Sequence, residues 1–195
     1  MSKKYIKGDV DVSRRYLTKL PDFLSDVEVT GFFACNNNKL TTLEGSPTIV
    51  RGVYACGQNL ITSLKGAPDY VKGNFFCNAN KLLESLEGCP TRLGDGLYCS
   101  FNESLVSLAG APSSVKFFAC NYNNQLKSLK GGPTRVEGFF YCLGNKKLTS
   151  LEGFPEYIGR DLQFKRNGRE FTEEEIRAVC EVKGQIFLEP PPKRR

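Results

Sequence analysis

The sequence predicts a mostly-β solenoid of short stacked repeats, and three regularities carry this prediction. A proline, a cysteine and a Leu-x-x-Leu pair each recur every 21 or 22 residues along the middle of the chain. A unit of this length cannot bury an apolar face by itself, so the core must run through units that stack on one another. The prolines are Pro47, Pro68, Pro90, Pro112, Pro133 and Pro155.

Residues 1–30 are expected to form an N-terminal strand and a diverged first repeat. In the stretch GDVDVSRRYLTKLP, Val10 and Val12 take the strand positions. Arg15 stands where the later units carry an asparagine. Divergence of this kind is typical of the terminal unit of a repeat array.

Residues 31–168 contain the regular repeats. The first half of each unit alternates with period two, which predicts a strand with Val50, Gly52, Tyr54 and Cys56 pointing inward in one unit. The second half, Leu-x-x-Leu-x-Gly-x-Pro, is too short for a returning α-helix. We therefore expect an extended or 3-10 return path, with glycine allowing a tight corner and proline fixing φ. About eight to nine strands should form one parallel sheet.

Six cysteines occupy one repeating position, and an asparagine follows each of them three residues later. Cysteine is a small apolar residue that can stack on itself in adjacent strands, so we interpret the six as buried free thiols. The asparagines fall where each strand ends, and we expect their amides to form a ladder along the coils. These asparagines are Asn38, Asn59, Asn80, Asn102, Asn123 and Asn145.

Residues 169–195 should close the array with a capping helix, a final strand and a basic, proline-rich tail. Thr172 and Glu175 have the spacing of a capping box, and Gly184 is expected to end the helix. Alternation resumes at Ile186 and Leu188. The predicted apolar helix face consists of Ile176, Val179 and Cys180.

The Leu-x-x-Leu step, with Cys-x-x-Asn before it, resembles the leucine-rich repeat. The short period and the proline-bearing turn are similar to those of bacterial effector proteins, and the Gly-x-Pro form resembles repeat proteins of bacteriophages. This resemblance implies a leucine-rich-repeat solenoid of the α/β horseshoe class, here mostly β. The parallel sheet would line its concave face, and the extended or 3-10 segments its convex side.

Composition argues against several functional classes. The chain has no histidine, which removes the commonest general base, and it has no CxxC pair for zinc, so we expect neither catalysis nor a metal or other cofactor. The net charge is +6, with basic residues concentrated towards the two ends. No apolar stretch suggests a signal peptide or a membrane span, so a cytoplasmic protein without membrane contact is expected.

The outward strand positions are unexpectedly aromatic, and exposed aromatic groups commonly mark contact surfaces. Stacking between adjacent strands is the alternative explanation for these rings. The predicted partner-binding residues are Phe32, Val53, Asn74, Phe76, Tyr98, Phe117, Phe139 and Tyr141. A possible polar rim consists of Asn36, Asn37, Phe101 and Tyr122.

These observations predict a non-enzymatic protein-binding module. By analogy with the phage proteins, it would bind and inhibit a host defence or regulatory protein in the host cytoplasm. Binding of single-stranded nucleic acid is the alternative, because bases stack on exposed rings while basic groups hold phosphates. A homo-oligomeric structural protein, such as a homodimer, is a third possibility.

Overall fold

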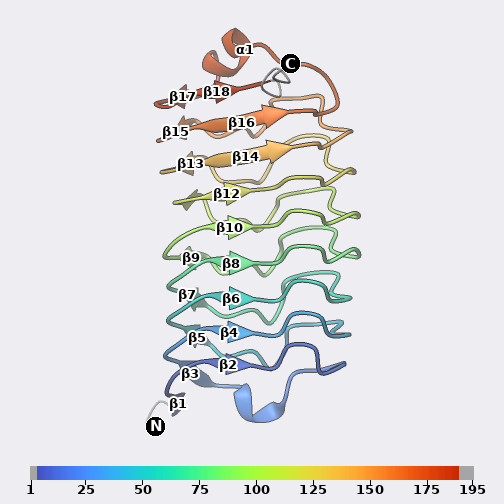
Figure 1. The fold of residues 1–195 in the computed structure, drawn as a ribbon, viewed down its shortest axis with the longest axis vertical. Coiled ribbons are helices and arrows are strands. Elements are labelled where there is room, and N and C mark those ends of the chain that lie inside the picture. Colours follow the sequence, from blue (N-terminus) through green and yellow to red (C-terminus); the bar gives the residue numbers. More distant parts are fainter. Residues whose placement is uncertain (1–3, 189–195) are drawn as a thin grey trace, which may run out of the picture.

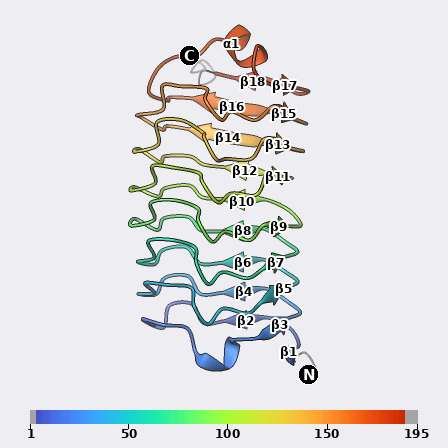
Figure 2. The same cartoon turned by 180° about the vertical axis from the view of Figure 1, so that it is seen from behind.

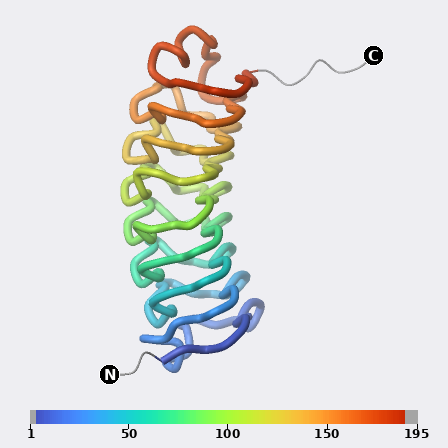
Figure 3. The backbone as a smooth tube through the Cα atoms, turned by 90° about the vertical axis from the view of Figure 1, so that its left-hand side faces the viewer, coloured from blue at the N-terminus to red at the C-terminus, as the bar shows by residue number. Residues whose placement is uncertain are grey.

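The structure is a computed structural model that describes residues 4–188. The chain winds into a column of about eight stacked coils, with its first and last described residues at opposite ends (Figure 1). This is the parallel β-solenoid expected from the repeats. Figures 1 and 3 show a nearly straight column rather than a horseshoe, so the face predicted to be concave is called here the outer face of the main sheet.

One side of the column is a nine-stranded parallel sheet, which receives one short strand from each coil. Consecutive coils align in register. The two residues before Cys56 pair with the two residues before Cys77, so that Tyr54 lies beside Phe75 and Ala55 beside Phe76. The strands, in spatial order, are β2 (Val10–Asp11), β4 (Phe33–Ala34), β6 (Tyr54–Ala55), β8 (Phe75–Phe76), β10 (Leu97–Tyr98), β12 (Phe118–Ala119), β14 (Phe140–Leu143), β16 (Leu162–Lys165) and β18 (Ile186–Phe187).

A second side carries two further parallel sheets, which are visible from behind in Figure 2. The five-stranded sheet contains β1 (Lys4–Ile6), β3 (Val27–Val29), β5 (Ile49–Val50), β7 (Tyr70–Val71) and β9 (Arg92–Leu93). The four-stranded sheet contains β11 (Ser114–Val115), β13 (Arg135–Val136), β15 (Tyr157–Ile158) and β17 (Glu181–Val182).

These extra sheets correct the prediction of one continuous strand per unit. Val50 is buried as expected, but it belongs to β5, and the chain turns before Tyr54 begins its run in β6. Gly52 lies in the intervening corner, where a Cβ atom would lie 2.7 Å from the carbonyl carbon of Gly31 in the preceding coil. A side chain does not fit where corners stack this closely, and glycine is required.

The third side of each coil is formed by the Leu-x-x-Leu-x-Gly-x-Pro segment and contains turns rather than strands. In one coil the backbone N–H of Ala67 donates to the carbonyl oxygen of Leu64 at 3.0 Å, and the same bond recurs along the column. Gly66 between them has φ +85°, which a side chain would strain. A single 3-10 turn, η1 (Asp22–Leu24), lies in the first coil of the described chain.

The interior follows the predicted parity. Phe33 and Cys35 are fully buried, while Phe32 and Ala34 are at least partly exposed. Later coils keep this pattern at most positions, and Ala119, which is 4% exposed, departs from it. The rings of Phe33, Tyr54 and Phe75 stack with centroids 5.3 and 5.2 Å apart. The core is therefore a set of columns in which like residues lie above one another.

The asparagines form the predicted ladder inside the column. The N–H of Asn80 donates to Oδ1 of Asn102 at 2.8 Å, and the N–H of Asn102 donates to Oδ1 of Asn123 at 2.8 Å. Each amide also reaches its own coil: Nδ2 of Asn102 donates to the carbonyl oxygen of Cys99 at 2.7 Å. Sequence reasoning missed one further member, Asn167, whose Oδ1 accepts the N–H of Asn145 at 3.0 Å.

The C-terminal cap is shorter than predicted. The helix α1 (Glu173–Arg177) begins with the expected capping box between Thr172 and Glu175. It does not continue to Gly184, because the chain enters strand β17 at Glu181. Val179, which was predicted to belong to the apolar helix face, is exposed. The final strand is present as β18, paired with β16. The predicted basic tail lies outside the described residues.

Loss of one ladder amide should destabilise the protein strongly. Asn102→Ala leaves the buried N–H of Asn80 and the carbonyl of Cys99 without their bonds, so we expect the free energy of unfolding to fall by about 2–4 kcal/mol. Urea titration followed by circular dichroism measures the change. The matched control is Asn121→Ala, which removes one half-buried bond to the N–H of Leu143 and should cost only about 1 kcal/mol. Equal losses in the two variants would refute the ladder's importance.

Candidate functional site

The candidate site is the outer face of the nine-stranded sheet. Strand register places the residue before each cysteine position in one line across this face, which we call the outer row. Ala34 and Ala55 lie in its N-terminal half, and its aromatic members begin at Phe76; a third alanine, Ala119, is buried between Tyr98 and Tyr141. In order, the outer row is Asp11, Ala34, Ala55, Phe76, Tyr98, Ala119, Tyr141, Gln163 and Phe187.

Five of the predicted residues form an aromatic patch. The rings of Phe76 and Tyr98 stack with centroids 4.5 Å apart. Phe139 lies 6.2 Å from Phe117 and 6.1 Å from Tyr141, again in stacked pairs. Stacked pairs of this kind stabilise the sheet, yet all five rings remain half-exposed rather than buried. We call these five residues the aromatic patch.

Desolvation and charge distinguish the patch from ordinary surface. Partial burial raises the pKa of the Tyr98 hydroxyl, with smaller contributions from Tyr141 and Asp95. The guanidinium carbon of Arg160 lies 5.5 Å from the ring centroid of Phe139, which places one cation at the C-terminal border. The patch itself is apolar, and its polar atoms are phenol hydroxyls.

Three other predicted residues lie beside the patch rather than in it. Phe32 is 37% exposed at the start of the strand segment of its coil. Val53 is half-exposed in the next coil. Asn74 has a structural role, because its Oδ1 accepts the N–H of Gly96 at 2.8 Å and so bonds one coil to the next.

The predicted rim separates into two kinds of residue. Asn36 bonds to the next coil, with its Oδ1 accepting the N–H of Gly57 at 2.7 Å. Asn37, Phe101 and Tyr122 all have φ between +54° and +62°, a region that bulky residues rarely occupy. The rings of Phe101 and Tyr122 stack 4.9 Å apart and are 53% and 38% exposed. Positive φ recurs at this position in other coils, for example at Gln58 and Ala79, so it is a property of the turn. The aromatic pair is a second exposed apolar feature of the same side.

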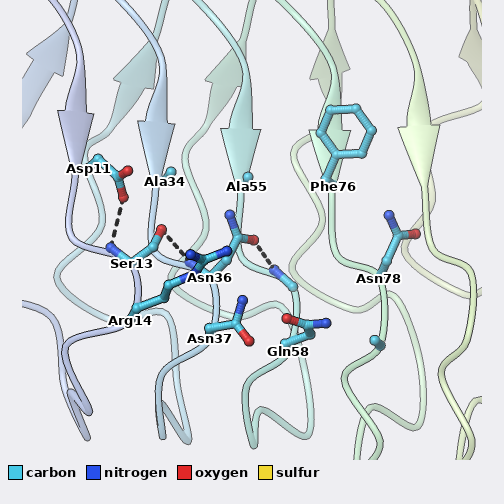
Figure 4. Close-up of a pocket in the computed structure, with 12 residues that line it drawn as sticks. Asp11, Ser13, Arg14, Ala34, Asn36, Asn37, Ala55, Gln58, Phe76 and Asn78 are labelled. Atoms are coloured by element: carbon cyan, nitrogen blue, oxygen red, sulfur yellow. Dashed lines mark hydrogen bonds between the residues drawn. The ribbon is translucent and has the colours of Figure 1, made fainter.

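The structure also shows a trough that sequence reasoning missed. It lies on the N-terminal half of the outer face, has a volume of about 640 Å³, and is shown in Figure 4. Ala34 and Ala55 form its floor between Asp11 and Phe76. The signal was present in the sequence, since Ala34 and Ala55 are two consecutive small residues in the outer row, whereas the third alanine, Ala119, lies between Tyr98 and Tyr141. The lining residues are Asp11, Ser13, Arg14, Ala34, Asn36, Asn37, Ala55, Gly57, Gln58, Phe76, Asn78 and Ala79.

All eight cysteines are free thiols and all are buried. Burial raises the pKa of the Cys35 and Cys77 thiols to about 12 and also raises the pKa of Cys56, Cys99 and Cys120. A thiolate is the nucleophilic form of cysteine, and these thiols stay protonated at neutral pH. They are packing groups of the core.

Residues 4–188 lack two kinds of feature. No cluster of three or more histidine, cysteine, aspartate or glutamate side chains is arranged to hold a metal ion. Over the same residues, none of the helices has the length and apolar character needed to cross a membrane.

Comparison with known proteins gave no match to a family model, to a curated protein or to a solved structure. The interpretation of the outer face therefore depends on its own geometry.

The thiol column makes stability dependent on alkaline pH. An unfolded cysteine loses its proton near pH 8.5, whereas Cys35 and Cys77 keep theirs to about pH 12. Above about pH 8.5 the unfolded state binds fewer protons, so stability is complete below that pH and is lost as pH rises towards 12. We expect the free energy of unfolding to fall by about 1.4 kcal/mol per pH unit for each such thiol.

Urea titrations at neutral pH and at about pH 10 measure this loss. Cys77→Ala is the control, because it should remove the contribution of one thiol and make the pH dependence shallower. A wild-type stability that does not change between the two pH values would contradict the assignment.

Proposed function

We propose that this chain is a non-enzymatic binding module that binds another protein through the outer face of its nine-stranded sheet. The observation that carries the proposal is the aromatic patch. Half-exposed rings lie over β8 to β14 in two stacked groups, Phe76 with Tyr98 and Phe139 with Phe117 and Tyr141. Exposed apolar surfaces on soluble proteins commonly serve as contact sites, and aromatic residues commonly dominate their binding energy.

The way the patch is held supports a binding role. Its rings project from backbone that is hydrogen-bonded to a coil on either side, so little conformational entropy is lost when a partner docks. Sheet stabilisation accounts for the stacked pairs, but β-branched residues would provide it with less exposed aromatic surface. Phe101 and Tyr122 add a further pair of exposed rings, stacked 4.9 Å apart.

The context of the proposal comes from the resemblance described above. We assign the chain to the leucine-rich-repeat proteins of bacteriophages and infer that it acts in the host cytoplasm by binding and inhibiting a host protein. A catalytic role has little support, since the chain has no histidine and the thiols with raised pKa values are protonated and buried. The module would act by occupying its partner.

The proposal predicts that charge in the patch abolishes partner binding. In the variant Phe76→Asp/Tyr98→Asp/Phe139→Asp, three carboxylates would have to be desolvated in the interface, so affinity should fall at least about a hundredfold. Affinity capture from bacterial lysate identifies the partner, and biolayer interferometry with the purified partner then measures the loss. Circular dichroism verifies that the variant remains folded.

The matched control is Phe23→Asp/Leu82→Asp/Val106→Asp, which places the same charge at three exposed apolar residues outside the patch. Retained binding by the control and lost binding by the patch variant would support the proposal. Equal binding by both would place the contact surface elsewhere.

A further inference from the structure

We propose that the trough beside the aromatic patch binds a neutral oligosaccharide. This ligand class goes beyond the protein partner proposed above, and the argument uses a different set of residues. Phe76 alone belongs to both the patch and the trough.

The shape of the trough suits an elongated ligand. Asp11 and Phe76 lie three strands apart in the outer row, which corresponds to about 14 Å at the usual spacing of parallel strands. Between them the floor consists only of Ala34 and Ala55, so nothing interrupts the trough along the column axis (Figure 4). A short chain of sugar rings can lie along such a floor, whereas a compact ligand would remain largely in solvent.

One long side of the trough supplies hydrogen-bond donors. Oδ1 of Asn36 accepts the N–H of Gly57 at 2.7 Å, and Oδ1 of Asn78 accepts the N–H of Ser100 at 2.8 Å. Their oxygens are thus committed to the solenoid, and their amide nitrogens remain available (Figure 4). Ser13 Oγ accepts the N–H of Asn36 at 3.1 Å, and the Ser13 side chain also hydrogen-bonds the Asp11 carboxylate, so Ser13 orients its neighbours and the two amides are the donors of this side.

The N-terminal end of the trough carries both an acceptor and a cation. Oδ1 of Asp11 accepts the N–H of Ser13 at 2.8 Å, and hydrogen bonds with Ser13 are the main reason that the pKa of Asp11 is lowered. The backbone N–H of Arg14 donates to the carbonyl oxygen of Asn36 at 3.0 Å, whereas its guanidinium makes no hydrogen bond or ion pair with the other residues of the described part of the chain. The two opposite charges offset each other, which favours a neutral ligand over a polyanion or a polycation.

Phe76 provides an apolar platform at the other end. Its ring stacks on Tyr98 with a centroid separation of 4.5 Å and is seen close to face-on in Figure 4. The apolar C–H face of a pyranose packs on an aromatic face, while its hydroxyls both donate and accept. A bound peptide strand would require pockets for alternate side chains, and the flat alanine floor offers none. The combination of platform, amides and offset charges therefore favours a sugar.

The test uses an array of immobilised oligosaccharides probed with the labelled full chain. Titration calorimetry with the free oligosaccharide that gives the strongest signal follows. Ala55→Phe fills the floor with a ring that stacks in the outer row, so it should leave the fold intact and weaken binding by about tenfold or more. Ala34→Phe is a second variant with the same expected effect.

The matched control is Gln163→Phe, which adds a ring to the same outer row outside the trough and should leave sugar binding unchanged. No array signal for the wild-type chain would overturn the proposal. Binding that survives both alanine substitutions would overturn it too, as would floor-sensitive binding to peptides without any binding to sugars. None of these substitutions alters Tyr98, Phe117, Phe139 or Tyr141, so the result is separable from that of the protein-partner experiment.

Discussion

The buried asparagine ladder is the interaction on which the rest of the structure depends. Each coil must turn away from the main sheet just after its cysteine, and there the backbone loses the regular bonds of a strand. The side-chain amide of Asn80 supplies both missing partners. Its Oδ1 accepts the N–H of Asn59 at 2.8 Å, and its Nδ2 donates to the carbonyl oxygen of Cys77 at 2.9 Å. Backbone groups buried without such partners would cost about 1–3 kcal/mol each. The turn can repeat because its buried bonds repeat.

Exact repetition then restricts every residue that faces a neighbouring coil. Side chains at one position lie about 4.8 Å from their counterparts, so an inward position must stack on itself. Phenylalanine does so through its ring faces, and cysteine through its small volume. At the Gly52 corner even a Cβ atom does not fit. The outward positions escape this restriction, and the chain varies there from aspartate to alanine to aromatic residues.

Much of this architecture could be predicted from the sequence because it is periodic. Alternation placed Phe33 inside and Phe32 outside, and the spacing from cysteine identified the ladder. The corner before Tyr54 was missed because Val50, Gly52 and Tyr54 keep the alternation of a single strand, although Val50 lies in β5 and Tyr54 in β6. Asn167 follows Phe164 by the ladder's spacing of three residues, but no cysteine marks that unit.

The candidate site was less accessible to such reasoning because it depends on register between coils. The aromatic patch could be found residue by residue, since each ring is large and outward in its own unit. The trough could not, because it exists only where two coils carrying alanine lie between coils carrying Asp11 and Phe76. Sequence patterns describe a unit, whereas a groove is a property of several units together.

The two halves of the outer face share one physical advantage for binding. Asn36 and Asn78 face the trough with amide nitrogens whose orientation is set by the bonds of their oxygens to neighbouring coils. The ring of Phe76 is held similarly by Tyr98. Groups that the scaffold already orders lose little entropy on binding, so a shallow surface can still bind with useful affinity. The bonds that make the coils stack are thus the same bonds that prepare the surface for a ligand.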